Sequence, residues 1–264
     1  MTTTTRTKSW SRPYGRGTGG RSGISLEGLR REKVPGKVLG VLGGMGPEAT
    51  VAFLAKVVEK TPAERDQDHL HVVVDMDPSV PDRTDALLSG RTGPVVEALS
   101  RMARRLVGMG AELLAIPCNT AHVFLDEIRE AVPVPVLDMI GEVVETVTGA
   151  TSHLKRVGLL ATTGTVRSGL YRRRFSEFGV EILEPPSPDQ GRLMEGIQAI
   201  KAGKHGEALN SFRDVAGNLA EAGAQVLVTG CTELSLLLPR WEPPVPCFDA
   251  LDILAEAAVR ETLR

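Results

Sequence analysis

Two cysteines are the residues in this chain whose types and positions are suited to acid–base chemistry. Cys118 follows an apolar run at 113–116, and Cys231 follows a second apolar run at 226–228. Both runs have the same kind of entry, a glycine and an alanine followed by a polar residue. Two thiols in matching contexts can move one proton across a carbon centre, because one removes it as thiolate while the other supplies it.

The apolar run before each cysteine predicts a buried strand, so each thiol is expected where a strand ends. Residues 123–128 have helical spacing, which places Cys118 between a strand and a helix. Open α/β sheets bind their ligands at this position. A helix N-terminus there would also lower the pKa of the thiol, because its partial positive charge favours thiolate.

Cys118 has three possible roles on sequence grounds. It could be a packing residue, a nucleophile activated by His122, or one of a pair of acid–base thiols with Cys231. The repeated context favours the pair. Cys247 lies in the run 245–248 with no turn after it, so we expect it to pack in the core.

Polar residues beside the cysteines also have more than one interpretation. Asn119 and Thr120 occupy positions typical of helix caps, and they could equally donate hydrogen bonds to a substrate carboxylate. Glu233 could polarise the Cys231 thiol or contact a substrate ammonium group. These residues predict a polar site around the thiols, and both interpretations of each residue stay open.

Two cations lie outside the cysteine segments. Arg83 lies in a loop with two prolines at 77–84, where it could be a solvated surface charge or a bidentate clamp for a carboxylate. Its spacing alone favours the surface. Lys201 lies near the end of a predicted helix at 192–203, where its charge would complement the helix dipole.

The elements that must position these residues alternate between strand and helix. We expect strands at 37–42, 71–76, 113–116, 134–139 and 156–161, and helices starting at Pro47 and covering 95–109, 140–148, 192–203, 207–222 and 250–262. The glycine loop at 43–46 lacks the third glycine of a dinucleotide fingerprint and the lysine of a P-loop, so it does not predict a nucleotide site.

The second half of the chain repeats landmarks of the first at nearly constant offsets of 118, 113 and 111 residues. The matched pairs are Leu39 with Val157, Cys118 with Cys231, and Asp138 with Asp249. This duplication predicts an α/β fold of two pseudo-symmetric Rossmann-like lobes with parallel sheets, at 36–150 and 151–264. We expect the C-terminal helix to pack on the other lobe, and the active site in the cleft between the lobes.

Composition limits the remaining possibilities. The chain has 264 residues, 42% hydrophobic residues, 24% charged residues and a net charge of −2, which is typical of a globular protein and gives no case for nucleic acid or a membrane as partner. An odd count of 3 cysteines without metal-site spacing predicts a reducing, cytoplasmic compartment and no metal. Residues 1–35, rich in Thr, Ser, Gly and Arg, predict a disordered tail.

Four segments together resemble the cofactor-independent aspartate/glutamate racemases, and the aspartate racemases most nearly. They are residues 43–50, 81–84, 117–122 and 230–233, within a likeness that runs from about Val38 to the C-terminus. The resemblance implies a homodimeric two-domain α/β enzyme that interconverts L- and D-aspartate, or glutamate, without pyridoxal phosphate, metal or nucleotide. It implies that Cys118 and Cys231 are the acid–base thiols, and that Arg83 and Lys201 bind substrate carboxylates, which reverses the surface assignment of Arg83.

Further substrate contacts are expected from the loops around the two thiols, namely Met45, Gly46, Asn119, Thr120, Thr162, Thr232 and Glu233. Related cysteine-dependent enzymes that isomerise maleate, racemise hydantoins or decarboxylate arylmalonates are the near alternative, and a non-catalytic amino-acid-binding protein is the distant one. The pair Arg83 and Lys201 favours a dicarboxylate, and two intact cysteines favour an enzyme over a binding protein.

Overall fold

The computed structural model describes residues 36–264, so the tail predicted at 1–35 lies outside the described part. The first sheet has β1 (Leu39–Gly43) in the middle, β2 (Val72–Met76) on one side and β3 (Leu113–Ala115) on the other, all parallel. β1 and β3 are buried along their whole length, as continuous apolar runs in a covered parallel sheet should be. The helices of this half are α1 (Pro47–Lys60), α2 (Arg83–Ser89), α3 (Gly93–Gly108), α4 (Leu125–Glu130) and α5 (Met139–Ala150).

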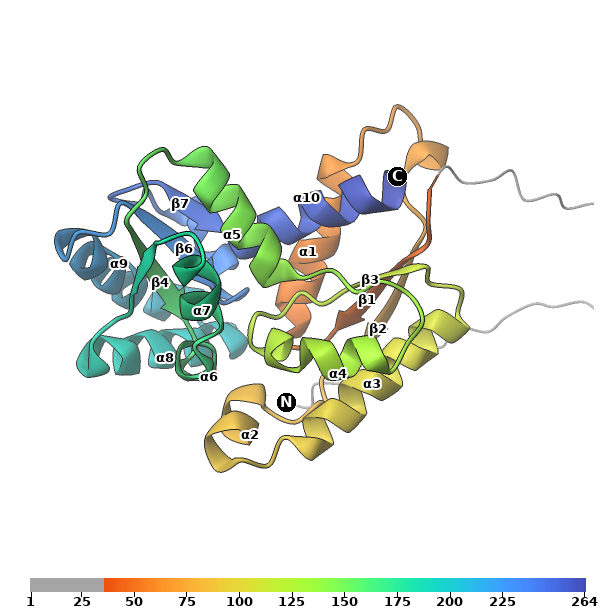
Figure 1. The fold of residues 1–264 in the computed structure, drawn as a ribbon, viewed down its shortest axis with the longest axis horizontal. Helices are drawn as coiled ribbons and strands as arrows, with labels where there is room; N and C mark the ends of the chain where they lie inside the picture. Colours follow the sequence, from red (N-terminus) through yellow and green to blue (C-terminus); the bar gives the residue numbers. More distant parts are fainter. Residues whose placement is uncertain (1–35) are drawn as a thin grey trace, which may run out of the picture. The chain divides into compact units, whose positions relative to one another are not determined.

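The second sheet repeats this arrangement with one more strand. Its order is β5 (Glu181–Leu183), β4 (Arg156–Ala161), β6 (Val226–Gly230) and β7 (Cys247–Asp249), again all parallel. Its helices are α6 (Thr163–Ser168), α7 (Leu170–Ser176), α8 (Ser187–Lys201), α9 (His205–Glu221) and α10 (Ala250–Leu263). β4 takes the place of β1, β5 that of β2 and β6 that of β3. The α/β fold with two similar parallel sheets is therefore confirmed (Figure 1).

The strand predicted at 134–139 is reduced to a single bridge. Leu114 pairs with Val136, through hydrogen bonds from the Leu114 amide to the Pro135 carbonyl and from the Leu137 amide to the Leu114 carbonyl. The ladder does not extend beyond this bridge, and the proline does not explain this, because Pro246 holds the equivalent position in the second half. In the second half the corresponding strand, β7, begins just after Pro246 and forms fully.

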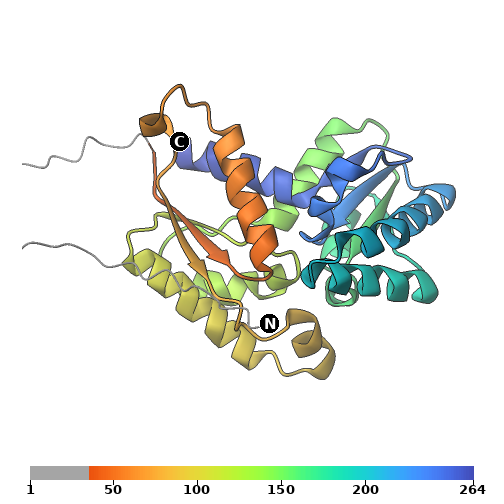
Figure 2. The same ribbon diagram turned by 180° about the vertical axis from the view of Figure 1, so that it is seen from behind.

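The helices α5 and α10 join the two sheets through one apolar core. α10 packs against α1 and β3 of the first half, whereas α5 packs against α7 of the second and against α10 (Figures 1 and 2). The shared core contains Val41 of β1, Val143 of α5, Leu159 of β4 and Leu254 of α10. A charged contact follows the same path, since Lys56 on α1 meets Asp252 on α10 at 2.9 Å.

Several short elements were not expected from the sequence. These are α2, α6, α7 and β5, and α8 begins at Ser187 rather than at 192. Arg83 is therefore the first residue of a helix rather than part of a loop. Asp82 caps the start of this helix, because its side chain accepts a hydrogen bond from the Asp85 amide. No helix within residues 36–264 has both the length and the apolar composition needed to cross a bilayer.

Candidate active site

Both cysteines lie just beyond the carboxyl ends of corresponding strands. Cys231 follows β6 directly, and Cys118 follows β3 after Ile116 and Pro117. The two residues are buried, with 5% of Cys118 and 3% of Cys231 exposed. Both line one small cavity, which we call the inner cavity. The two halves therefore bring their thiols to a common space, as the duplication predicted.

The inner cavity collects nearly all the predicted site residues. Besides the two cysteines it is lined by Met45, Asp82, Arg83, Thr84, Asn119, Thr120, Thr162, Lys201, Thr232 and Glu233. Gly46 lines a second, larger cavity instead, which we call the outer cavity. The two cavities share Asp82, Arg83, Lys201 and Glu233, so these side chains form the partition between them.

The sizes of the two cavities differ greatly. The inner cavity has a volume of about 20 Å³ and the outer one about 450 Å³. A space of 20 Å³ accommodates about one water molecule and no amino acid. The inner cavity must therefore widen before an amino acid can reach the thiols.

The structure corrects the expected helix N-terminus at the thiols. Cys118 is followed by a 3₁₀ helix, Thr120–Phe124, before α4 begins, and Cys231 is followed only by the short 3₁₀ turn Leu234–Leu236. Neither Asn119 nor Thr120 caps the backbone here, since the 3₁₀ helix has no side-chain cap. Short turns have few aligned peptide dipoles, so nearby charges have to set the thiol ionisation.

His122 is not placed to act as a general base for Cys118. Its Nδ1 lies 2.8 Å from the Cys118 carbonyl oxygen, and its Nε2 accepts from the Met139 amide at 3.2 Å. Because Nε2 accepts, the ring hydrogen is on Nδ1 and is donated to the carbonyl. Burial lowers the pKa of His122, so the imidazole is neutral and ties the Cys118 loop to the start of α5.

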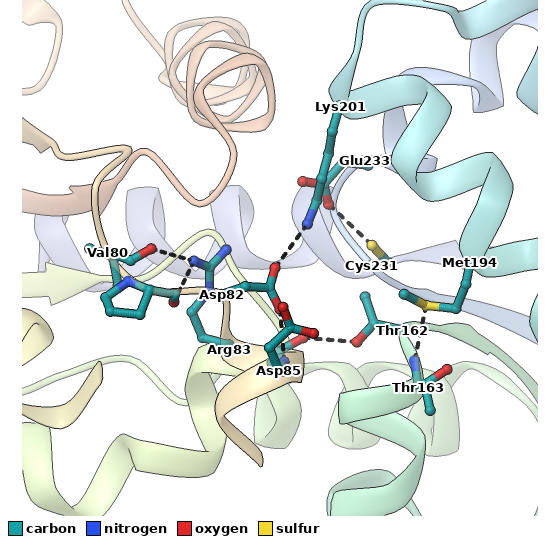
Figure 3. Close-up of polar contacts among 12 residues, drawn as sticks. Val80, Asp82, Arg83, Asp85, Thr162, Thr163, Met194, Lys201, Cys231 and Glu233 are labelled. Carbon is teal, nitrogen blue, oxygen red and sulfur yellow. Dashed lines mark hydrogen bonds and ion pairs between the residues drawn. The ribbon is translucent and has the colours of Figure 1, made fainter. Parts of the chain in front are cut away.

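Charge gathers around Cys231 rather than around Cys118. The Cys231 thiol donates to Oε2 of Glu233 at 3.1 Å (Figure 3). Burial and the Glu233 carboxylate raise the pKa of Cys231 well above its ordinary value, and Lys201 offsets this only in part. Cys231 is thus a thiol with a hydrogen-bonded proton.

Lys201 reaches the site from the last residue of α8. Its ammonium group lies 3.7 Å from Asp82 of the other half (Figure 3). Burial by itself would lower the pKa of Lys201, but the negative charges around it, Glu233 foremost and Asp82 with it, outweigh burial and raise the pKa. Lys201 is therefore a fixed positive charge in the partition, already paired with a carboxylate across the two halves.

Arg83 is buried rather than on the surface, with 8% exposed. One of its terminal nitrogens, Nη1, donates to the carbonyls of Val80 and Pro81 at 3.1 and 3.0 Å (Figure 3). These bonds hold the guanidinium in one orientation. Its Nε is buried and has no hydrogen-bond partner.

Neutral hydrogen bonds also join the two halves at the inner cavity. The Thr120 hydroxyl lies 3.0 Å from that of Thr162 and 2.9 Å from that of Thr165. The Tyr171 hydroxyl donates to Oδ1 of Asn119 at 2.6 Å. The sequence analysis did not identify Tyr171 or Thr165 as site residues. It did not identify Asp82 either, although an acidic residue directly before Arg83 could have indicated a charged contact there.

Three residues that line the inner cavity carry buried polar atoms without a hydrogen-bond partner. They are Nε of Arg83, Nδ2 of Asn119 and Oε1 of Glu233. Buried polar groups without partners are rare and costly, so such a cluster indicates a ligand that supplies the missing bonds. Two donors and one acceptor suit a molecule that carries both a carboxylate and an ammonium group.

Cys247 stands apart from the inner cavity. It lies in β7 against the core of the second half, and burial raises its pKa to about 12. A thiol in this environment packs as an apolar residue. Among residues 36–264, no group of three or more His, Cys, Asp or Glu side chains is arranged to hold a metal ion.

Comparison with known proteins gives one consistent group of relatives. Residues 42–258 match the family described as Asp/Glu/hydantoin racemase. The chain is 26% identical over 226 residues to the broad specificity amino-acid racemase RacX of Bacillus subtilis (strain 168), a match that covers 84% of this chain and 96% of that protein.

Solved structures agree with this match. The Picrophilus torridus aspartate racemase has a TM-score of 0.76 and 30% identity, over 86% of this chain and 94% of that one. An aspartate racemase homologue from Pyrococcus horikoshii OT3 has a TM-score of 0.70 over 86% of this chain and 100% of that one. Its 23% identity supports the fold alone.

Replacing His122 with alanine tests its role at the Cys118 loop. The change leaves the Cys118 carbonyl and the Met139 amide without partners, which should lower the free energy of unfolding by about 1–3 kcal/mol. Because the folded pKa is depressed, only the unfolded chain gains this proton as pH falls below about 6.5, so the wild type loses stability there. His122→Ala should lose less stability over that pH range.

Urea unfolding at neutral and mildly acidic pH measures both effects. His71→Ala is the matched control, because His71 is exposed and should behave as the wild type at both pH values. Equal pH dependence in the wild type and His122→Ala would contradict the assignment of a neutral, buried imidazole.

Proposed function

The chain belongs to the Asp/Glu/hydantoin racemase family, and we propose that it interconverts L- and D-aspartate by proton transfer between Cys118 and Cys231. The observation that carries the proposal is that both thiols line one cavity with unpartnered donors and an unpartnered acceptor. The name of the Picrophilus torridus relative supports aspartate, and glutamate is the second candidate substrate. The chemistry requires no cofactor, because each thiol can hold or release the proton itself.

The proposed reaction has two proton transfers. The thiolate of one cysteine takes the α-proton and becomes a thiol, while the C–H electron pair stays on Cα. The thiol of the other cysteine then protonates Cα from the opposite face and becomes a thiolate. One S–H bond forms and another breaks, so the enzyme finishes with its two cysteines in exchanged protonation states. The next turnover in the same direction requires these states to be restored by exchange with solvent.

The polar residues of the inner cavity supply the stabilisation that this reaction needs. An amino-acid α-proton is weakly acidic, so charge developing on the carboxylate in the transition state must meet preorganised donors. Nε of Arg83 and Nδ2 of Asn119 are such donors, and Oε1 of Glu233 accepts from the substrate ammonium group. Further contacts come from Met45, Gly46, Thr120, Thr162 and Thr232, which line the two cavities.

Lys201 is proposed to bind the second carboxylate of the substrate. It lies in the partition toward the outer cavity, where a side-chain carboxylate would extend from Cα. Asp82 already pairs with this ammonium at 3.7 Å, so the incoming carboxylate must share or displace that contact. Opening of the Asp82–Lys201 contact would also join the two cavities and admit the substrate.

We propose two lobes at 36–150 and 151–264, a homodimer, and a cytoplasmic location in which the thiols stay reduced. A hydantoin racemase or a related isomerase or decarboxylase remains the alternative reaction class. The two cations that line the inner cavity, the buried Arg83 and the partly exposed Lys201, favour the dicarboxylate over these substrates.

Replacement of either cysteine should stop racemisation while the fold is kept. Cys118→Ala and Cys231→Ala should each lower kcat/KM for aspartate by about 10²–10⁴-fold or more, because each removes one of the two proton-transfer groups. Chiral chromatography measures the rate, and circular dichroism checks the fold. Cys247→Ala should remain active, since that thiol lies outside the inner cavity. Full activity in either of the first two variants would rule out the two-thiol reaction.

The two cations should determine the preference for a dicarboxylate. Arg83→Ala should cost on the order of 2–5 kcal/mol of transition-state binding, because a desolvated carboxylate is left unpaired. Arg83→Lys should restore only part of it, since ammonium lacks the guanidinium fork. Loss of the cation that meets the side-chain carboxylate should reduce kcat/KM for aspartate far more than for alanine. Wild-type activity on aspartate after removal of both Arg83 and Lys201 would exclude the dicarboxylate assignment.

Glu233 should control the pH dependence through Cys231. Glu233→Gln removes the charge that, with burial, holds the pKa of Cys231 above its ordinary value, so that pKa should fall. One direction of racemisation requires Cys231 as the thiolate, so its kcat/KM rises with pH as this thiol ionises. In Glu233→Gln this rise should occur at lower pH. Rates in both directions across a pH series measure this. Glu48→Gln, at the outer cavity, should leave the profile in place, and an unmoved profile in Glu233→Gln would contradict the assignment.

A further inference from the structure

The buried hydroxyl of Tyr171 is a polar group that the reaction described above does not use. Tyr171 lies on α7 in the second half, is 1% exposed, and reaches across to Asn119 of the first half at 2.6 Å. Its ring packs near that of Phe175, with 6.3 Å between the centroids. Asn119 is the residue after Cys118 and lines the inner cavity. A side chain from one half thus contacts the thiol loop of the other.

The direction of this hydrogen bond is fixed by the proton on Tyr171. Burial raises the pKa of the phenol above its ordinary value, so the hydroxyl keeps its hydrogen. A buried hydroxyl hydrogen needs an acceptor, and Oδ1 of Asn119 is the acceptor that the described residues provide. An amide turned the other way would present NH₂ to the hydroxyl and leave the phenolic hydrogen without an acceptor.

The orientation of the amide decides what Asn119 offers to the cavity. With Oδ1 held by Tyr171, the free end of the side chain is Nδ2, which is buried and has no partner. Nδ2 is a donor, which attracts a carboxylate, whereas Oδ1 in its place would repel one. One hydroxyl on α7 therefore determines the chemical character of a cavity-lining group next to Cys118.

We propose that Tyr171 is a positioning residue that holds the Asn119 amide with its NH₂ group toward the substrate carboxylate. The inference rests on the proposed function, since it takes the ligand of the inner cavity to carry a carboxylate. It adds a specificity element from the second half that acts through a residue of the first. Tyr171 itself does not touch the substrate, because it does not line the inner cavity.

Tyr171→Phe removes the hydroxyl and keeps the ring, so it separates positioning from packing. We expect it to weaken L-aspartate binding and kcat/KM about tenfold, the effect of losing one well-oriented hydrogen bond to a charged group. Asn119→Ala should lose at least as much. Tyr171→Phe should then change neither quantity in an Asn119→Ala background, because its effect passes through that amide.

The matched control is Phe175→Leu on the same helix, which is buried in the same core and makes no polar contact. It should lower stability and leave L-aspartate binding by the folded protein unchanged. Equal losses from Tyr171→Phe with and without Asn119 would overturn the positioning role, as would unchanged aspartate binding in folded Tyr171→Phe.

Two readouts keep this inference separate from the proposed reaction. Calorimetric titration of L-aspartate into Cys118→Ala/Cys231→Ala, with and without Tyr171→Phe, measures binding without turnover. In the free protein, the side-chain amide signals of Asn119, assigned by their loss in Asn119→Ala, should be sharp in the wild type and broadened by exchange in Tyr171→Phe. Unaltered signals would overturn the inference. A wild type that shows the sharp signals but does not racemise aspartate would count against the reaction alone.

Discussion

The apolar core shared by the two sheets is the constraint on which the site depends. α10 follows the second sheet but packs on α1 and β3, and α5 follows the first sheet but packs on α7. The halves are therefore held together by buried side chains such as Val143 and Leu254, which contribute to one core from both sides. Because both sheets are parallel, the carboxyl ends of β3 and β6 each lie at one edge, and the shared core brings the two thiols that follow them to one cavity.

The contacts around the cavity differ in kind from this core. Around the inner cavity, the halves are joined by neutral hydrogen bonds that involve Thr120 and Asn119. At the partition they are joined by the ion pair of Asp82 with Lys201, whose 3.7 Å separation and partial exposure make it weaker than the buried core. The inner cavity is too small for an amino acid, so opening should occur at the partition while the core and the hydrogen bonds stay intact.

The two thiols occupy equivalent positions after β3 and β6, but their surroundings differ. Cys231 donates its proton to Glu233 and has Lys201 nearby, and its pKa is raised. Cys118 instead has the neutral ring of His122 bound to its carbonyl, and Asn119 beside it. Cys231 is therefore suited to supply a proton first. This difference between two similar loops is consistent with a site that treats the two enantiomers by different residues.

The sequence predicted the main strands and helices better than the polar contacts between side chains. Apolar runs such as the one before Cys118 identified the strands, because burial in a parallel sheet selects for them directly. The failures came where local pattern does not determine conformation. The strand predicted at 134–139 became a single bridge, a 3₁₀ helix replaced the expected α-helix start after Cys118, and His122 bonded to backbone groups instead of to a thiol.

Contacts between the halves were beyond sequence reasoning for a physical reason. Tyr171 directly precedes three arginines, and its local signal is its place on the buried face of α7 with Phe175. Its partner, Asn119, is 52 residues away in the chain and in the other half. Such a contact depends on how two folded units meet, which no local periodicity encodes. The same holds for Asp82, whose pairing with Lys201 crosses the partition.

The claim that two different thiols act on opposite faces of Cα is tested most directly by racemisation in D₂O. The wild-type protein is given L-aspartate with hydrogen at Cα, and both enantiomers are separated early in the reaction and analysed by mass spectrometry. Because the proton removed by one cysteine is not the one delivered by the other, the D-aspartate formed should carry deuterium at Cα while the remaining L-aspartate keeps its hydrogen. D-aspartate that retains the original hydrogen would show that one group both removes and returns the proton, and would contradict the two-thiol account.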